Sequence, residues 1–176
     1  HVGFTPKSVL IVGYSYDAPQ VAHEVADYLR SRGITSSILS TDPWNEPPGA
    51  CSASVIDEAR STASSSDLII VLGGDGSFLR GTDLAHGADI PIIGINMGHV
   101  GFLAELEADN IWNALDRLIS GDFTVEDRMT IDVGVVSDNR VRTGSWAINE
   151  LSLEKATHRG ILEATLAIDN LSLIHI

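Results

Sequence analysis

Three glycines surround one carboxylate in the middle of the chain. Gly73, Gly74 and Gly76 flank Asp75, directly after the apolar run Leu68–Leu72. Glycines allow a ligand to approach the backbone closely, and a turn between a strand and a helix directs N–H groups at one point, which suits phosphate. Asp75 would repel phosphate unless it accepts a proton from a hydroxyl nucleophile or helps to hold Mg²⁺. The alternative is a tight turn in which Asp75 only caps the next helix.

Two later segments could contribute to the same site. A second glycine-rich turn, GINMGHVGFL, ends an apolar run, and its Phe102 could either stack on a base or pack in the core. In the segment WAINE, Asn149 and Glu150 could bind ribose hydroxyls or lie solvated on an edge strand. As neighbours in a regular strand they would point to opposite faces. His, Cys, Asp and Glu show no metal-ligand spacing in the sequence, so we expect no structural metal site.

The elements that must position these residues alternate between strand and helix in the first two-thirds of the chain, which is the α/β pattern. Apolar runs predict strands at 8–12, 35–39, 68–72 and 92–95. Amphipathic stretches predict helices that start near Asp17 and Asp109, and helices over 55–61 and 78–86. Later strand-like runs at 129–136, 141–155 and 161–169 have no helix between them, and residues 137–140 predict a hairpin turn.

This order of elements predicts two domains. Residues 7–127 would form an open α/β domain with a mostly parallel sheet, Rossmann- or flavodoxin-like, that carries the GGDG motif. Residues 128–170 would open an all-β domain that three strands cannot complete. The last six residues, LSLIHI, read like a translated transposase-end sequence, so residues 171–176 are treated as an artefact and left out of the fold assignment.

Composition and charge narrow the possible partners. Apolar residues make up 44% of the 176 residues, enough for a core, while the longest apolar runs are too short to span a bilayer. Lys and Arg number 11 against 24 Asp and Glu, and the net charge of −13 disfavours nucleic acids and anionic membranes as partners. The single cysteine, Cys51, suits a reducing compartment, and no signal peptide opens the chain, so we expect a cytoplasmic protein.

In order and spacing, GGDGSFLR, PIIGINMGHVGFLAE and WAINELSLEK resemble the NAD kinase family. The resemblance runs from about Ser8 to Asp169. It implies that a phosphoryl group passes from ATP or polyphosphate, with Mg²⁺ or another divalent cation, to the 2′-hydroxyl of NAD to give NADP. It also implies small nucleotides as partners and a homo-oligomer in the full-length protein.

The resemblance assigns roles to individual residues. Asp75 matches the family's proton acceptor, and Gly73, Gly74 and Gly76 match the glycines that cradle the phosphates. Arg80 matches a positive charge that opposes the pyrophosphate of NAD, and Phe102 matches an aromatic residue beside the adenine. Asn149 and Glu150 match the pair that holds the ribose. His158 and Arg159 are further basic candidates for a ligand contact. The family also has a TPTGSTAY-like segment in its β domain, which this sequence does not contain. We therefore expect the chain alone to lack half of its substrate site and to show no appreciable kinase activity.

Two other functions stay open. A diacylglycerol-type lipid kinase shares the GGDG motif, but it would need a hydrophobic acceptor site, and the negative charge and the Asn149–Glu150 pair argue against it. A non-catalytic α/β ligand-binding domain, such as a receiver module, would carry an acidic pair after its first strand. That position holds the sequence YSYD, which has one acidic residue.

Overall fold

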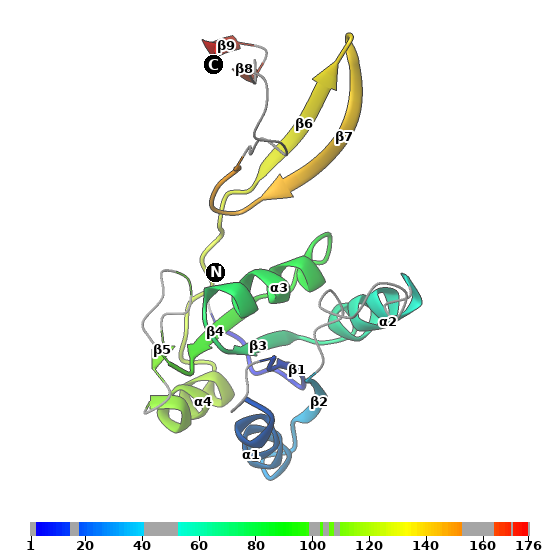
Figure 1. Cartoon of the computed structure of the whole chain (residues 1–176). Coiled ribbons are helices and arrows are strands. Elements are labelled where there is room, and N and C mark those ends of the chain that lie inside the picture. Colours follow the sequence, from blue (N-terminus) through cyan, green and yellow to red (C-terminus); the bar gives the residue numbers. More distant parts are fainter. Residues whose placement is uncertain are drawn as a thin grey trace. The chain divides into compact units, whose positions relative to one another are not determined.

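A parallel five-stranded sheet forms the centre of the first part of the chain (Figure 1). The computed structural model describes residues 3–14, 18–40, 53–98, 103, 106–107, 110–152, 164–169 and 171–175. The strands β1 to β5 are Ser8–Val12, Thr35–Leu39, Leu68–Leu72, Ile92–Asn96 and Leu106–Glu107. Their order in the sheet is β2-β1-β3-β4-β5, and every neighbouring pair is parallel. The carboxyl ends of the strands therefore share one edge of the sheet.

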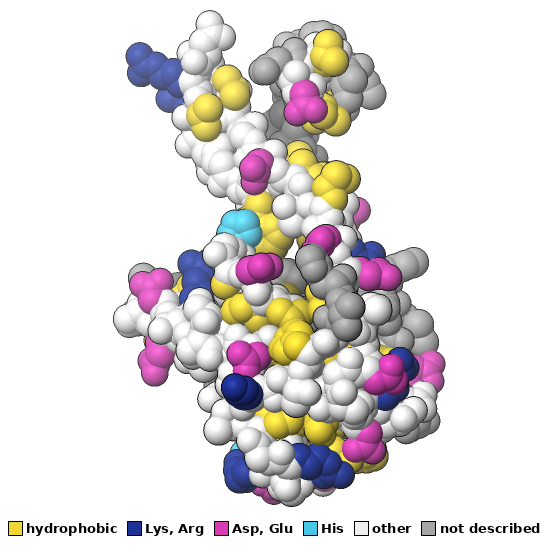
Figure 2. Space-filling model, turned by 180° about the vertical axis from the view of Figure 1, so that it is seen from behind, with side chains coloured by type: hydrophobic (Ala, Val, Ile, Leu, Met, Phe, Trp, Pro, Cys, Tyr) yellow, Lys and Arg dark blue, Asp and Glu magenta, His cyan; other side chains and the backbone are white. Residues whose placement is uncertain are grey.

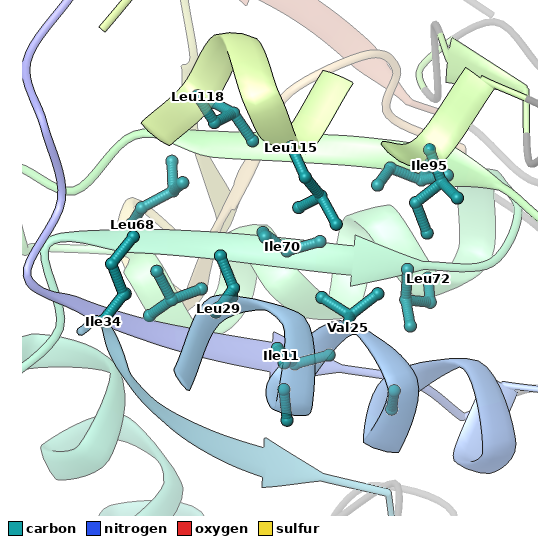
Figure 3. Packing of buried hydrophobic residues seen from close by; sticks show 14 of the residues in the cluster. Ile11, Val25, Leu29, Ile34, Leu68, Ile70, Leu72, Ile95, Leu115 and Leu118 are labelled. Atoms are coloured by element: carbon teal, nitrogen blue, oxygen red, sulfur yellow. The ribbon is translucent and has the colours of Figure 1, made fainter. Parts of the chain in front are cut away.

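Four helices cover the two faces of this sheet: α1 (Ala18–Arg30), α2 (Ala53–Ser64), α3 (Asp75–Ala85) and α4 (Ile111–Ser120). Alternate residues of a strand point to opposite faces. Ile70 accordingly packs in a cluster with side chains of α1 and α4 (Figure 3), whereas its neighbour Val71 packs in a second cluster with side chains of α2 and α3. Covered on both faces, β3 reads as an uninterrupted apolar run, as expected for a parallel sheet.

Glycines in the left-handed conformation follow two of the helices. Gly33, with φ of 80°, comes shortly after α1, and its N–H donates to the carbonyl of Arg30. Gly121, with φ of 74°, is the C-cap of α4, and its N–H donates to the last-turn carbonyls of Arg117 and Leu118. A residue without Cβ adopts this conformation with little strain, which suits glycine at the end of a helix.

The chain divides into two compact units, His1–Glu126 and Asp127–Ile176. The second unit holds two antiparallel pairs, β6 (Ile131–Ser137) with β7 (Arg140–Ala147) and β8 (Thr165–Ile168) with β9 (Leu171–His175). The predicted hairpin turn joins β6 and β7, and positive φ at both Asp138 and Asn139 gives the geometry of a type I′ turn.

Several boundaries differ from the sequence-based expectation. Helix α3 begins at Asp75 rather than Phe78, because the chain becomes helical inside the glycine-rich turn. Strand β7 ends at Ala147, so the prediction of one strand that runs to Lys155 is wrong. The short strand β5 was not predicted, because two residues carry no periodicity. Leu171–His175, left out of the fold assignment, is a strand paired with β8.

The helix starts expected near Asp17 and Asp109 involve residues outside the described ranges. α1 begins at Ala18, and Asn110 is the N-cap of α4. In the part of the chain that the structure describes, no helix has the length and apolar character needed to cross a membrane.

Candidate functional site

The strand order reverses at the carboxyl edge between β1 and β3. Within the sheet, β2 lies next to β1 on one side and β3 lies next to it on the other, so the chain reverses its direction across the sheet after β2. Open α/β sheets bind ligands at such a switch point, in the crevice outside the carboxyl ends of the strands. Gly73 and Gly74 follow β3 directly at this edge, and Met97 and Gly98 follow β4.

Gly73 is required by the fold of the turn itself. Its φ of 151° lies in the region that favours glycine, and a Cβ at this position would lie 2.5 Å from the Oγ of Ser77. The Gly73 N–H donates to the carbonyl of Ile95 at 3.0 Å, which ties the turn to β4. The sequence prediction that a glycine permits this turn is therefore supported by a specific close approach.

Gly74 and Gly76 are glycines for a different reason. Both are exposed, and among the described residues a Cβ on either would meet nothing within 4 Å. Packing against the described part of the chain therefore does not require glycine there, and the two positions expose the backbone at the start of α3. The first turn of a helix presents N–H groups that the helix itself leaves unsatisfied, with the positive end of the helix dipole behind them. Bare backbone at such a point suits a phosphate group.

Asp75 joins the two glycine-rich turns. It is the first residue of α3 and is partly buried, and its Oδ1 accepts a hydrogen bond from the N–H of Leu103 at 2.9 Å. The alternative in which Asp75 merely caps α3 is not what the structure shows, because the N-cap is Gly74 and no side chain caps the helix. The carboxylate instead links positions 28 residues apart in the sequence.

Asn96 supports the second turn, and the sequence analysis did not single it out. Its side chain is only 4% exposed at the end of β4, and its Oδ1 accepts the N–H of Gly98 at 3.0 Å. An Asn that bonds to the backbone two residues later forms a local turn of its own. The signal in the sequence was an Asn at the end of a buried strand, two residues before a glycine. Phe102, the predicted aromatic contact, lies outside the described residues, as do His158 and Arg159.

Arg80 lies on α3, one turn beyond Gly76, and is partly exposed. Its charge acts on Asp83 of the same helix. Burial raises the pKa of the Asp83 carboxyl, and the positive charges of Arg80, Arg60 and His86 partly offset that rise. Lys and Arg number only 11 in the sequence, and they are scattered over the face that Figure 2 shows.

Asn149 and Glu150 lie in the second unit, beyond the end of β7, and both are exposed. The strand predicted over 141–155 does not reach them, because the ladder with β6 ends at Ala147. The geometry above concerns the first unit alone. Within the described residues, no group of three or more His, Cys, Asp or Glu side chains could hold a metal ion.

Residues 16–123 match the protein family described as ATP-NAD kinase N-terminal domain. The NAD kinase of Corynebacterium efficiens is 43% identical over 171 residues, which cover 94% of this chain and 54% of that relative. The NAD kinase of Corynebacterium glutamicum is 49% identical over 148 residues, which cover 82% of this chain and 51% of that relative. The chain thus spans about half the length of these relatives.

The fold has a counterpart among solved structures. The crystal structure of yeast NADH kinase complexed with NADH matches with a TM-score of 0.59 and 15% sequence identity, over 82% of this chain and 48% of that chain. At this level of identity the likeness concerns the fold. It agrees with the predicted class, a parallel α/β domain followed by antiparallel strands.

Proposed function

Because the chain belongs to the NAD kinase family, we propose that its protein transfers the terminal phosphoryl group of ATP to the 2′-hydroxyl of the adenosine ribose of NAD, giving NADP. The proposal covers the activity of the whole protein, since the chain spans about half the length of its relatives. The observation that carries it is the placement of Asp75. The carboxylate of Asp75 lies between the exposed glycines Gly74 and Gly76 at the start of α3, at the switch point of the sheet.

In this reaction Asp75 is the proton acceptor. The ribose oxygen attacks the terminal phosphorus of the donor, a new O–P bond forms, and the bond from that phosphorus to the bridging oxygen breaks to release ADP. The proton of the ribose hydroxyl passes to the carboxylate of Asp75 as the oxygen attacks. Phosphoryl transfer demands mainly positioning and charge stabilisation, and the backbone N–H groups at the start of α3 supply both.

The residues of the first unit fit Mg²⁺ bound mainly through the phosphates of the donor. Mg²⁺ commonly takes one or two protein carboxylates together with phosphate oxygens and water, rather than a cage of protein side chains. Asp75 offers one carboxylate beside the proposed phosphate position, and the described residues form no larger group of ligands. When bound, the ion would offset the negative charge of the donor phosphates.

The remaining predicted residues complete the proposal for NAD. Arg80 would oppose the charge of the pyrophosphate, Phe102 would lie beside the adenine, and Asn149 and Glu150 would hold the ribose. We also propose that the enzyme works in the cytoplasm as a homo-oligomer on small nucleotides. The net charge of −13 supports the expectation that neither nucleic acid nor a membrane is a partner.

The experiment is a transfer assay with the full-length protein. NAD, NADH and diacylglycerol are offered separately as acceptors, and ATP and polyphosphate as donors, each with and without Mg²⁺. We expect NADP to form from NAD and ATP, and we expect no phosphorylation of diacylglycerol. Phosphorylated diacylglycerol without NADP would instead establish the lipid kinase, and transfer to neither acceptor would favour the ligand-binding domain.

A further inference from the structure

We infer that the backbone N–H of Leu103 is a positioning group for phosphoryl transfer: it holds Oδ1 of Asp75 and so sets the direction and the basicity of the proton acceptor. The inference rests on the proposed function, in which Asp75 takes the proton. Its basis is the hydrogen bond of 2.9 Å from the Leu103 N–H to the carboxylate, in a partly buried setting. The bond spans 28 residues, so it is a tertiary contact and not a local cap.

The bond acts on the chemistry of the carboxylate in two ways. A donor N–H stabilises the ionised form of a carboxyl group, so it favours the state that can accept a proton. It also hinders rotation about the Cβ–Cγ bond, because turning the carboxylate out of its plane would break the contact at Oδ1. The bond thus fixes the orientation of the carboxylate plane at the start of α3.

The contact also makes the second glycine-rich turn part of the catalytic arrangement. The turn after β3 is tied to β4 by the bond from the Gly73 N–H to the Ile95 carbonyl. Past β4, the Gly98 N–H donates to Oδ1 of Asn96, and further on the Leu103 N–H reaches back to Asp75. The family's second motif thus contributes a backbone group to the proton acceptor, in addition to any side chain that contacts the nucleotide.

The hydrogen bond from Leu103 could hold the loop alone or could also position Asp75, and the two roles predict different effects on the pH dependence of turnover. If the bond only tethers the loop, its loss destabilises the fold but leaves the pH dependence of turnover unchanged. If it positions Asp75, its loss removes a donor from the carboxylate and shifts the acid limb of the pH profile upward. The readout is therefore a pH profile together with separate values of kcat and KM.

The first test compares Leu103→Pro with Leu103→Ala in the full-length protein. Proline has no N–H, whereas alanine keeps the donor and removes most of the side chain. In Leu103→Pro we expect the acid limb of kcat to move upward by roughly one pH unit and kcat to fall on the order of tenfold or more, with KM for NAD little changed. Leu103→Ala should keep the acid limb of the wild-type protein. Equal acid limbs in the two folded variants would overturn the inference.

The second test needs no substitution at Leu103 and no activity, so it stands even if Leu103→Pro does not fold. The amide resonance of Leu103 is followed by NMR in the 176-residue chain while the pH is lowered. We expect it to move with the ionisation of Asp75 and to lose that movement in Asp75→Asn. The Gly98 amide, which donates to the neutral side chain of Asn96, is the matched control and should not follow the same titration.

The outcomes separate the inference from the proposed function. A Leu103 amide that does not respond to Asp75 overturns the inference, whatever the enzyme does. A responding amide in a protein that forms no NADP leaves the contact in place and overturns the function proposed for it.

Discussion

Strand β3 of the first unit and strand β6 of the second unit lie at opposite extremes of burial. Every residue of β3 is buried, with Leu68 at 2% exposure and the other four at 0%, whereas six of the seven residues of β6 are exposed. β3 lies between two layers of helices that fill both faces of the sheet. β6 is paired with β7, and large apolar side chains of the pair stay exposed, among them Val136 at 61% and Val141 at 72%.

The difference shows where the site gets its rigidity. Asp75 and its glycines directly follow the most deeply buried strand of the first unit, so the core sets the position of the proposed proton acceptor. A two-stranded hairpin without a covering layer is only marginally stable in water. We therefore expect the first unit to supply most of the stability of this chain, and substitutions in the two units to differ strongly in effect.

The largest difference is expected between two truncations of apolar side chains. Ile70→Ala removes a fully buried side chain from β3 and should lower the free energy of unfolding by about 2–5 kcal/mol. Val136→Ala, in β6, should change it by less than about 0.5 kcal/mol, because that side chain is exposed. Urea unfolding of the whole chain measures both. A loss for Val136→Ala as large as that for Ile70→Ala would contradict the comparison.

The two units also differ in how far the sequence predicted them. In the first unit the runs at 8–12, 35–39 and 68–72 are bounded by turn residues, and the structure has strands with the same bounds. In the second unit, β7 ends at Ala147 although the strand-like pattern continues to Lys155. Where turn residues bound a run, local pattern and fold agree. Where the strand-like pattern continues without such residues, as after Ala147, pattern alone does not say where pairing stops.

The candidate site shows the same limit. The glycine-rich turn that holds Asp75 could be predicted from residue types and order, because it depends on the local sequence, and the chemistry proposed for Asp75 stays a prediction. The bond from Leu103 to Asp75 could not, since it joins residues 28 positions apart and its donor is a backbone group that carries no sequence signal. The role of Asn96 could not be predicted either, because an Asn at the end of an apolar run does not reveal that its side chain is buried and bonded to the backbone.

A smaller effect is expected where α3 packs against β3. A Cβ at Gly81 would lie 2.5 Å from Cγ2 of Val71, which is itself in the core. Gly81→Ala should therefore lower the free energy of unfolding by about 1–3 kcal/mol through overpacking. Thermal unfolding with a matched measurement on Gly76→Ala tests this. Unchanged stability in Gly81→Ala would mean that α3 can move away from the sheet, against the rigidity inferred above.

Gly76→Ala should act in the opposite direction on stability. The position is helical and open, so alanine should raise the free energy of unfolding by about 0.5–1 kcal/mol. The added methyl group would at the same time intrude on the bare backbone where we propose the donor phosphates to bind, so KM for ATP in the full-length protein should rise. A more stable protein with unchanged KM would argue against the phosphate position.

The smallest effect is expected from a pH-dependent contact near the amino ends of β1 and β3. Hydrogen bonds from the backbone N–H groups of Lys7 and Ser8 lower the pKa of the Asp67 carboxyl below its ordinary value of 3.8. A lowered pKa in the folded state stabilises the fold at pH values above the ordinary one, and that contribution is lost as the pH falls through the folded-state pKa. Asp67→Asn should therefore lower stability slightly at neutral pH, and the difference from the wild-type protein should shrink below about pH 4. Urea midpoints measured at several pH values test this, and a difference that grows on acidification would contradict it.

The proposed function depends on the carboxylate of Asp75 as the acceptor of the proton from the ribose hydroxyl. Asp75→Asn keeps the size of the side chain and removes its basicity, so turnover of NAD to NADP by the full-length protein should fall on the order of a hundredfold to ten-thousandfold. The affinity for NAD, measured by calorimetry on the same preparation, should stay within a few-fold of the wild-type value. NADP formation near the wild-type rate in Asp75→Asn would show that some other group takes the proton.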